Sequence, residues 1–216
     1  MEAKGVIKNK HFGSIYKTRS EQLSVVIPFL ISGLENREKC IYVYTDNLPD
    51  EICDLLATSG IDINKTIREE QLVFLTKEET YLTRGFFSPD GMLDFIQYAH
   101  YDALKNGFSG ISGFGEMSWA LSGIPGSERL IEYENRLNQV LIGLRFNLLC
   151  QYNETKFPEN TLLGVIHTHP DIMLYGKQYN NPYYVRPDVF SDNWNQEYPQ
   201  GAYSRVRDHI ASQNLS

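Results

Sequence analysis

The sequence predicts an α/β fold: one domain built on a mainly parallel β-sheet with helices on both faces. Two periodicities indicate this class. Short β-branched and aromatic runs alternate with segments whose apolar residues recur every three or four positions, as on one face of a helix. This strand–helix–strand order repeats four times, which favours right-handed crossovers and a buried parallel sheet. With 216 residues, the chain is long enough to bury a core without disulfides or a structural metal ion.

Short apolar runs are the predicted strands, and amphipathic segments between them are the predicted helices. The strands are expected at 12–16, 40–44, 72–75, 108–114, 148–152 and 162–167. The helices are expected at about 23–34, 49–59, 88–107 and after 127. Pro28 should kink the first helix or lie in its first turn. Ser88 and Pro89 predict the start of the third helix as N-cap and first residue, and Gly107 predicts its end.

The alternation stops after about Ile172, where aromatic residues are scattered among Asn, Pro, Asp and Gln. We expect a domain over 1–184 and, over 185–216, an irregular tail that wraps on this domain or on a partner and closes with a short helix at 203–212. The aromatic residues of this region are Tyr175, Tyr179, Tyr183, Tyr184, Phe190, Trp194, Tyr198 and Tyr203. Exposed aromatic surface marks interfaces, so a homodimer is expected.

Composition and charge narrow the functional classes. The net charge of −7 and the pI near 5.3 argue against direct binding of nucleic acid or of an anionic membrane surface. The N-terminal residues lack the apolar core of a signal peptide, and the longest apolar stretch, at 23–34, is too short to span a bilayer. The three cysteines, Cys40, Cys53 and Cys150, form no C-x-x-C pair, which predicts reduced thiols and a cytoplasmic protein.

The first strand–loop–helix unit is typical of a RecA-like ATPase, but the phosphate loop is degenerate. That loop would lie between Tyr16 and Gln22, and a phosphate cradle needs glycines so that backbone N–H groups can close on the phosphates. This stretch contains no glycine. Lys17 and Thr18 are a relic of such a loop or simply part of a polar surface loop.

Two other motifs place polar groups next to apolar runs. Glu116 follows a predicted buried strand, as the acidic residue of a nucleotide site would, although the same turn can be purely structural. His167 and His169 form an H-x-H pair that would point to one side of a strand, a pattern found in zinc sites. A third ligand would have to come from Asp171, Glu116 or Cys150; a hydrogen-bonding role for His169 is the stronger alternative.

In an open parallel sheet, ligands bind in the crevice at the carboxyl ends of the strands. Polar and aromatic residues just past the predicted strands would meet there and suit a small, partly apolar guest. The predicted ligand-binding residues are Tyr16, Lys17, Asp46, Glu116, Trp119, Gln151, Tyr152 and His169. The alternative is that they satisfy one another's hydrogen bonds in a vestigial nucleotide site.

Several segments, taken in order, resemble one known family. They are Pro28-Phe29-Leu30 through Gly33-Leu34, Gly115-Glu116-Met117-Ser118-Trp119, Tyr133-Glu134 with Asn138, Cys150-Gln151-Tyr152, His169-Pro170 and Asn181-Pro182-Tyr183. Over about 10–184 the chain is similar to the MEDS domain, a sensory domain named from methanogens, methylotrophs and a dichloromethane-responsive regulator.

This resemblance implies a sensory input module with a RecA/KaiC-like fold that lacks the phosphate loop. Relatives occur alone or fused to histidine kinases, PAS domains or DNA-binding domains, and are thought to sense hydrocarbon derivatives. It implies no catalytic residue, and we expect no cofactor and no metal ion.

The leading hypothesis is therefore a non-catalytic signalling module that binds a small molecule, such as a hydrocarbon or one-carbon derivative, and acts on a histidine kinase or transcription regulator. Two alternatives stay open: a degenerate RecA-like nucleotide binder or ATPase, and a metal-dependent hydrolase built on His167 and His169.

Overall fold

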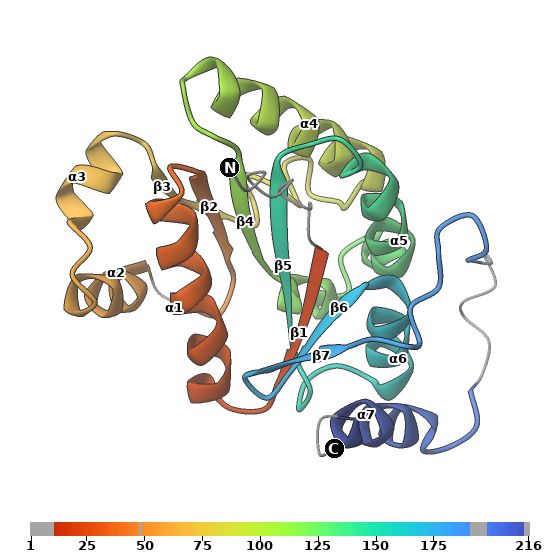
Figure 1. Cartoon of the computed structure of the whole chain (residues 1–216). Helices are drawn as coiled ribbons and strands as arrows, with labels where there is room; N and C mark the ends of the chain where they lie inside the picture. The colour runs from red at the N-terminus through yellow and green to blue at the C-terminus, as the bar shows by residue number, and fades with distance from the viewer. Residues whose placement is uncertain (1–10, 48, 191–197, 214–216) are drawn as a thin grey trace, which may run out of the picture.

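A twisted, mostly parallel sheet forms the centre of the fold in the computed structural model, which describes residues 11–47, 49–190 and 198–213 (Figure 1). Its seven strands lie in the order β3-β2-β4-β5-β1-β6-β7, and every neighbouring pair is parallel except β6 and β7. The strands are β1 (His11–Tyr16), β2 (Lys39–Tyr44), β3 (Leu72–Thr76), β4 (Ile111–Glu116), β5 (Phe146–Asn153), β6 (Asp171–Leu174) and β7 (Lys177–Asn180).

Helices cover both faces of the sheet and divide the core into two apolar clusters, which confirms the predicted fold class. One face carries α1 (Arg19–Glu35), α2 (Pro49–Thr58) and α3 (Ile63–Arg68). The other carries α4 (Pro89–Lys105), α5 (Leu130–Val140) and α6 (Glu159–Thr168), with α7 (Ala202–Ser212) against α6. Two 3₁₀ helices, Met117–Ser122 and Ser127–Arg129, connect β4 to α5.

Local capping signals define several helix ends. The Ser88 side chain accepts a hydrogen bond from the backbone N–H of Gly91, and Pro89 begins α4, as predicted. Gly107 has a φ of +85°, a left-handed conformation that suits the chain just after a helix end. Pro28 lies inside α1 rather than in its first turn, and the helix continues on both sides of it.

The predicted strand at 162–167 is wrong, because this segment belongs to helix α6. The run Leu162 to Ile166 is buried on all sides, so it shows neither the alternation of a strand nor the stripe of an amphipathic helix. Pro158 is the N-cap of α6. Consequently His167 lies in the last turn of a helix and His169 is its C-cap, so the two histidines do not share one side of a strand.

The expected end of regular structure at Ile172 is also wrong. Strands β6 and β7 form an antiparallel hairpin that extends the sheet next to β1. Its two turn residues, Tyr175 and Gly176, have φ values of +52° and +90°, and a two-residue turn with positive φ at both positions matches the twist of a hairpin. Helix α3, whose N-cap is Asp62, was not expected from the sequence.

Most aromatic residues beyond β6 pack back onto the domain. Tyr175, Tyr179, Tyr183, Phe190 and Tyr198 contact the cluster under α4, α5 and α6, and Tyr203 is part of its buried core. Trp194 lies outside the described residues. Helix α7 coincides with the helix expected at 203–212. These contacts favour a tail that covers its own domain, and they leave the exposed-aromatic argument for a homodimer weaker than the sequence suggested.

The length and hydropathy of the helices bear on membrane insertion. Among the described residues, none of the helices has the length and apolar character needed to cross a bilayer.

The three cysteines are free thiols, as expected, and they differ in burial. Burial, with the nearby charges of Glu38 and Glu134 respectively, raises the pKa of both buried thiols, whereas Cys53 is partly exposed. We predict that a thiol reagent labels Cys53 first in the native protein and reaches the other two only on unfolding. Mass spectrometry of the labelled peptides measures this order. Rapid native labelling at all three positions would contradict the packing of β2 and β5.

Candidate functional site

Polar side chains gather on both faces of the central strands, and this divides the predicted ligand site. Successive side chains of a strand point to opposite faces. Gln151 bonds to Gln22 of α1, whereas Cys150 and Tyr152 belong to the core on the side of α4, α5 and α6. Glu116 and Gln151 therefore lie on one face of the sheet, and Tyr152 and His169 lie on the other. These residues do not meet in the single cleft that the sequence suggested.

Glu116 at the end of β4 is held by the loop after β2. Its Oε2 accepts the backbone N–H groups of Thr45 at 2.9 Å, Asp46 at 2.5 Å and Asn47 at 3.1 Å. Its Oε1 accepts the Tyr42 hydroxyl at 2.8 Å. The carboxylate is buried, and its acceptor capacity is used by the protein itself, so it anchors the loop between β2 and α2.

Gln151 lies beside Glu116 on the same face of the sheet. Its Oε1 accepts a hydrogen bond of 2.8 Å from Gln22 Nε2 and lies 3.5 Å from the Tyr42 hydroxyl. Its Nε2 is buried and has no hydrogen-bond partner within the described part of the chain. This amide therefore has unused hydrogen-bonding capacity at the carboxyl ends of the strands.

The rim of this edge consists of ion pairs. Lys17 Nζ lies 3.3 Å from a Glu154 carboxylate oxygen and 4.8 Å from the centre of the Tyr175 ring. Lys156 Nζ lies 2.9 Å from Asp46. The exposed Lys156–Asp46 pair contributes little to stability, whereas the Glu154 carboxylate is largely buried.

Two aromatic residues of the predicted site are in the core. Tyr16 is buried, and this burial, with the charges of Glu116 and Asp46, raises the pKa of its hydroxyl. Trp119 is fully buried and stacks on Tyr81 at 4.7 Å between ring centroids. Trp119 therefore packs the core and is not a wall of the crevice.

The place of the phosphate loop is closed by a carboxylate. Only Lys17 and Thr18 connect β1 to α1. Their backbone N–H groups both donate to Glu21 Oε2, at 2.7 and 3.2 Å, and Thr18 Oγ1 accepts the Glu21 N–H in return. This capping box places a negative charge where a phosphate would need free N–H donors.

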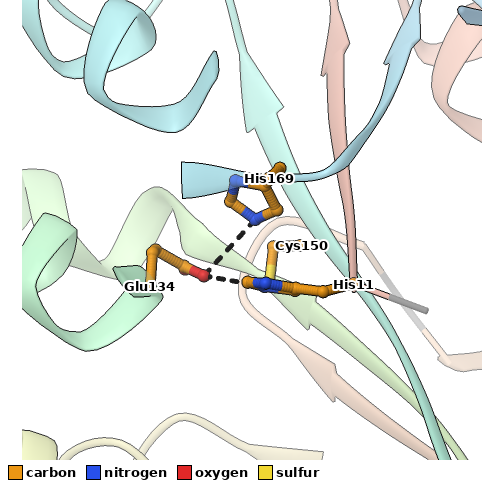
Figure 2. Close-up of side chains that lie close together, drawn as sticks. All are labelled: His11, Glu134, Cys150 and His169. Carbon is orange, nitrogen blue, oxygen red and sulfur yellow. Dashed lines mark hydrogen bonds and ion pairs between the residues drawn. The ribbon is translucent and has the colours of Figure 1, made fainter. Parts of the chain in front are cut away.

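A second cluster, on the other face, consists of His11, Glu134, Cys150 and His169. They come from the start of β1, from α5, from β5 and from the C-cap of α6. One donor atom of each lies within 4.8 Å of the others, and all four side chains are buried. Figure 2 shows His11 and His169 both directed at the Glu134 carboxylate, with the Cys150 sulfur beside them.

Hydrogen bonds fix the tautomers of both imidazoles. Asn138 Nδ2 donates to the Thr168 carbonyl at 2.7 Å, so its Oδ1 faces His11 Nδ1 at 3.1 Å as an acceptor. His169 Nδ1 lies 2.8 Å from the Val165 carbonyl, which can only accept. Both rings therefore carry a proton on Nδ1, and in the neutral form both Nε2 atoms present lone pairs to the cluster.

Glu134 is the charged centre of this cluster. Its Oε1 accepts the Tyr152 hydroxyl at 2.6 Å, and its Oε2 lies 3.1 Å from His11 Nε2 and 3.4 Å from His169 Nε2. Burial disfavours the charge, but hydrogen bonds and positive charge from the two imidazoles, in their protonated form, outweigh this effect and lower the pKa of Glu134 below its ordinary value. Burial, together with repulsion from His11, lowers the pKa of His169.

Only part of this second cluster was predicted from the sequence. His169 and Tyr152 were among the predicted site residues, and Cys150 was considered as a metal ligand. His169 was expected at the carboxyl ends of the strands. In the structure it precedes β6, which runs parallel to β1, so His169 lies at the amino end of β1, next to His11. His11, a lone histidine before a strand, was not predicted. His167, the proposed partner for His169, instead lies with its ring centroid 5.9 Å from that of Tyr198.

A cavity of about 610 Å³ opens beside this cluster. His11 and Asn138 line it on the side of the cluster. Its other lining residues are Gln139, Leu141, Ile142, Gly143, Pro170, Tyr184, Arg186, Pro187 and Asp188. The volume lies in the range of small-molecule sites. None of the eight predicted ligand-binding residues lines it.

Glu116 provides a test of the carboxyl-end cluster. We predict that Glu116→Ala lowers the free energy of unfolding by about 3 kcal/mol, because it leaves the buried N–H of Asn47 and the partly buried N–H of Thr45 without an acceptor. Urea denaturation followed by circular dichroism measures the change. Glu51→Ala, which removes a surface partner of Arg19, is the control and should cost less than about 1 kcal/mol. Equal losses would mean that Glu116 does not anchor the loop.

The closed first turn of α1 yields a second prediction. ATP with Mg²⁺ should show no binding at micromolar concentrations in calorimetry, because Glu21 occupies the N–H groups and repels the phosphates. Stoichiometric, tight binding would contradict this account of the helix start.

The sequence is similar to a known family and to a curated protein. The family model described as the methanogen/methylotroph, DcmR sensory domain (MEDS) matches residues 10–170. A curated relative, the transcriptional repressor DcmR of Methylorubrum extorquens, is 28% identical over 167 residues, which are 76% of this chain and 60% of that protein. The aligned part of the chain thus spans about three fifths of the relative's length.

Solved structures share the fold. A KaiC-like protein of Pyrococcus horikoshii OT3 superposes with a TM-score of 0.51 at 12% identity, over 76% of this chain and 70% of that one. An uncharacterised protein of Pyrococcus horikoshii, crystallised with an unknown peptide, superposes with a TM-score of 0.58 at 14% identity, over 77% of each chain. At these identities the likeness establishes the RecA-type fold alone. The family match covers most of the chain, and the chain belongs to the MEDS family of sensory domains.

Proposed function

We propose that this domain is a sensory input module without chemistry of its own, and that it binds a small, partly apolar molecule in the cavity beside His11 and Asn138. The observation that carries the proposal is the cavity itself. Its volume of about 610 Å³ suits a small organic molecule, and one wall is continuous with the buried cluster at the core. Occupation of the cavity can therefore alter the packing of β1 and α5.

The lining of the cavity supports a ligand that is mostly apolar. Leu141, Ile142, Pro170 and Pro187 provide apolar wall, and His11 and Asn138 are a small number of orienting polar groups. A hydrocarbon or one-carbon derivative, the class suggested by the family resemblance, has this chemistry.

The carboxyl-end residues remain a second candidate location for the same ligand. Gln151 Nε2 is buried and unpaired in the described part of the chain, and Tyr16, Lys17 and Asp46 lie at the same edge. Glu116 and Trp119 support this location less, because one is occupied by backbone donors and the other by the core.

Neither alternative function gains support from the geometry. A nucleotide site would need the N–H groups that Glu21 accepts, and a hydrolase built on His167 and His169 would need both side chains to converge. A regulatory role agrees best with the name of the curated relative. DcmR is named a transcriptional repressor, so we propose a transcription regulator or histidine kinase as the downstream partner, and self-association as part of the signal.

Nuclear magnetic resonance of the ¹⁵N-labelled protein tests the ligand site, with dichloromethane and methanol as probes. We predict that dichloromethane shifts the amide signals of 141–143 and 184–188. Ile142→Asp should weaken this binding roughly tenfold, the loss that corresponds to about 1.4 kcal/mol of apolar contact.

Ile142 is exposed, so its substitution should leave the fold intact, and Ile67→Asp on α3 is a matched exposed control outside the cavity. Shifts confined to Tyr16, Lys17 and Gln151 would move the site to the carboxyl ends of the strands. The absence of shifts with both probes would contradict a one-carbon ligand.

A further inference from the structure

We propose that His11, Glu134, Cys150 and His169 bind one divalent transition-metal ion, Zn²⁺ above all, in a closed tetrahedral site. The proposal goes beyond the sensory role and does not depend on the cavity ligand. It rests on the four donor atoms, on the direction of their lone pairs, and on His169 Nε2, which has no hydrogen-bond partner among the described residues.

Three of the donor–donor distances are close to those of a metal tetrahedron, and all four donor atoms lie within 4.8 Å of one another. With metal–nitrogen and metal–oxygen bonds of about 2.0–2.1 Å and a metal–sulfur bond of about 2.3 Å, neighbouring donors of a tetrahedron lie roughly 3.3–3.6 Å apart. His11 Nε2 lies 3.1 Å from Glu134 Oε2 and 3.6 Å from Cys150 Sγ. His169 Nε2 lies 3.4 Å from the same carboxylate oxygen.

The surrounding hydrogen bonds prepare both histidines as ligands. A metal-bound imidazole donates its other N–H to a carbonyl or carboxylate, which fixes the tautomer and the ring orientation. Here His11 Nδ1 faces the Asn138 side-chain carbonyl and His169 Nδ1 faces the Val165 backbone carbonyl. Each ring therefore directs an unprotonated Nε2 at the centre of the cluster.

With both imidazoles neutral, the Glu134 carboxylate has no positive charge beside it among the described residues. Two nitrogen lone pairs and one carboxylate oxygen face one another in a site shielded from water, an arrangement that is unfavourable without a cation between them. His169 is fully buried, and its Nε2 has no hydrogen bond to any of the described residues. Protonation of an imidazole could supply the charge, and the experiment below separates this outcome from a metal ion.

The donor set identifies the class of metal. Imidazole nitrogen and thiolate sulfur favour Zn²⁺ and related transition metals over Mg²⁺ or Ca²⁺, which prefer oxygen ligands. Binding forms a metal–sulfur bond and releases the Cys150 thiol proton to solvent, with no change in oxidation state. Because the protein supplies all four ligands, the site has the closed form typical of structural zinc.

The backbone around the site allows the His169 ring to lie close to β1. A Cβ atom at Gly13 would lie 2.9 Å from the His169 ring, so only glycine lets that ring sit against β1. Asn181 Nδ2 donates to the His169 carbonyl at 2.7 Å and holds the end of α6. A bound ion would join β1, α5, β5 and the α6–β6 connection in one place.

The test measures metal content and coordination of the whole chain. The protein is unfolded with chelator, refolded with Zn²⁺ or Co²⁺ and freed of excess metal, and its metal is measured by inductively coupled plasma mass spectrometry. We expect one ion per chain, a higher melting temperature than for the metal-free protein, and tetrahedral Co²⁺ bands with a thiolate-to-cobalt charge-transfer band.

Two cysteine variants provide a matched comparison. Cys150→Ser should lower the metal affinity by more than about 100-fold, beyond the 10–100-fold typical of residues that only orient a ligand. Cys40→Ser changes an equally buried thiol on the other face of the sheet and should keep one ion per chain. Asn138→Ala, which removes the partner of His11 Nδ1, should weaken binding about 10–100-fold.

Three results would overturn the proposal. A refolded wild-type protein without stoichiometric metal would leave a protonated histidine as the source of the positive charge. Cobalt spectra without a thiolate band would exclude Cys150 as a ligand, even if Cys150→Ser fails to fold. Equal metal content in Cys150→Ser and Cys40→Ser would place the ion elsewhere. None of these results decides whether the cavity binds dichloromethane, so the two proposals can fail separately.

Discussion

The buried charge of Glu134 is the constraint on which the arrangement of the domain depends. A carboxylate removed from water loses several kcal/mol of hydration, and the protein has to offset this loss with close partners. The Tyr152 hydroxyl donates one hydrogen bond, and a positive charge shared with the imidazoles of His11 and His169, as a proton or as a bound cation, supplies the rest. These partners come from β5, β1 and the end of α6, so one charge ties together elements from both halves of the chain.

The sheet has the strand and helix arrangement of a RecA-type fold, but the hydrogen-bonding groups at the carboxyl ends of its strands differ from those of a nucleotide site. At the carboxyl ends of the strands, Glu116 binds the loop after β2, and Glu21 closes the first turn of α1. Backbone N–H groups that would bind phosphates in a nucleotide enzyme donate here to carboxylates of the protein itself. The cavity and the buried cluster instead involve His11, at the amino end of β1. This displacement fits a family of sensory domains built on a RecA-type core.

Signals between near neighbours in sequence explain where prediction succeeded. The N-cap Ser88 with Pro89, and Gly107 after the helix, define α4 through contacts within a few residues. The same local rules failed at 162–167, because a helix buried on every side loses the periodicity that would reveal it. Because this segment was predicted as a strand, His167 was predicted to pair with His169 in a metal site, and His169 was predicted at the wrong edge of the sheet.

The sequence by itself determined the α/β class, most strands and helices, the missing phosphate loop and the family, since each depends on short patterns or on ordered motifs. Only the tertiary structure decided which polar residues meet. Cys150 and His11 are 139 positions apart, yet the register of β1 on β5 brings their side chains to 3.6 Å. Gln151 and Tyr152 are neighbours in the chain, but the alternation of the strand sends them to opposite faces. Strand order and register are set by packing across the whole domain, and no local pattern carries that information.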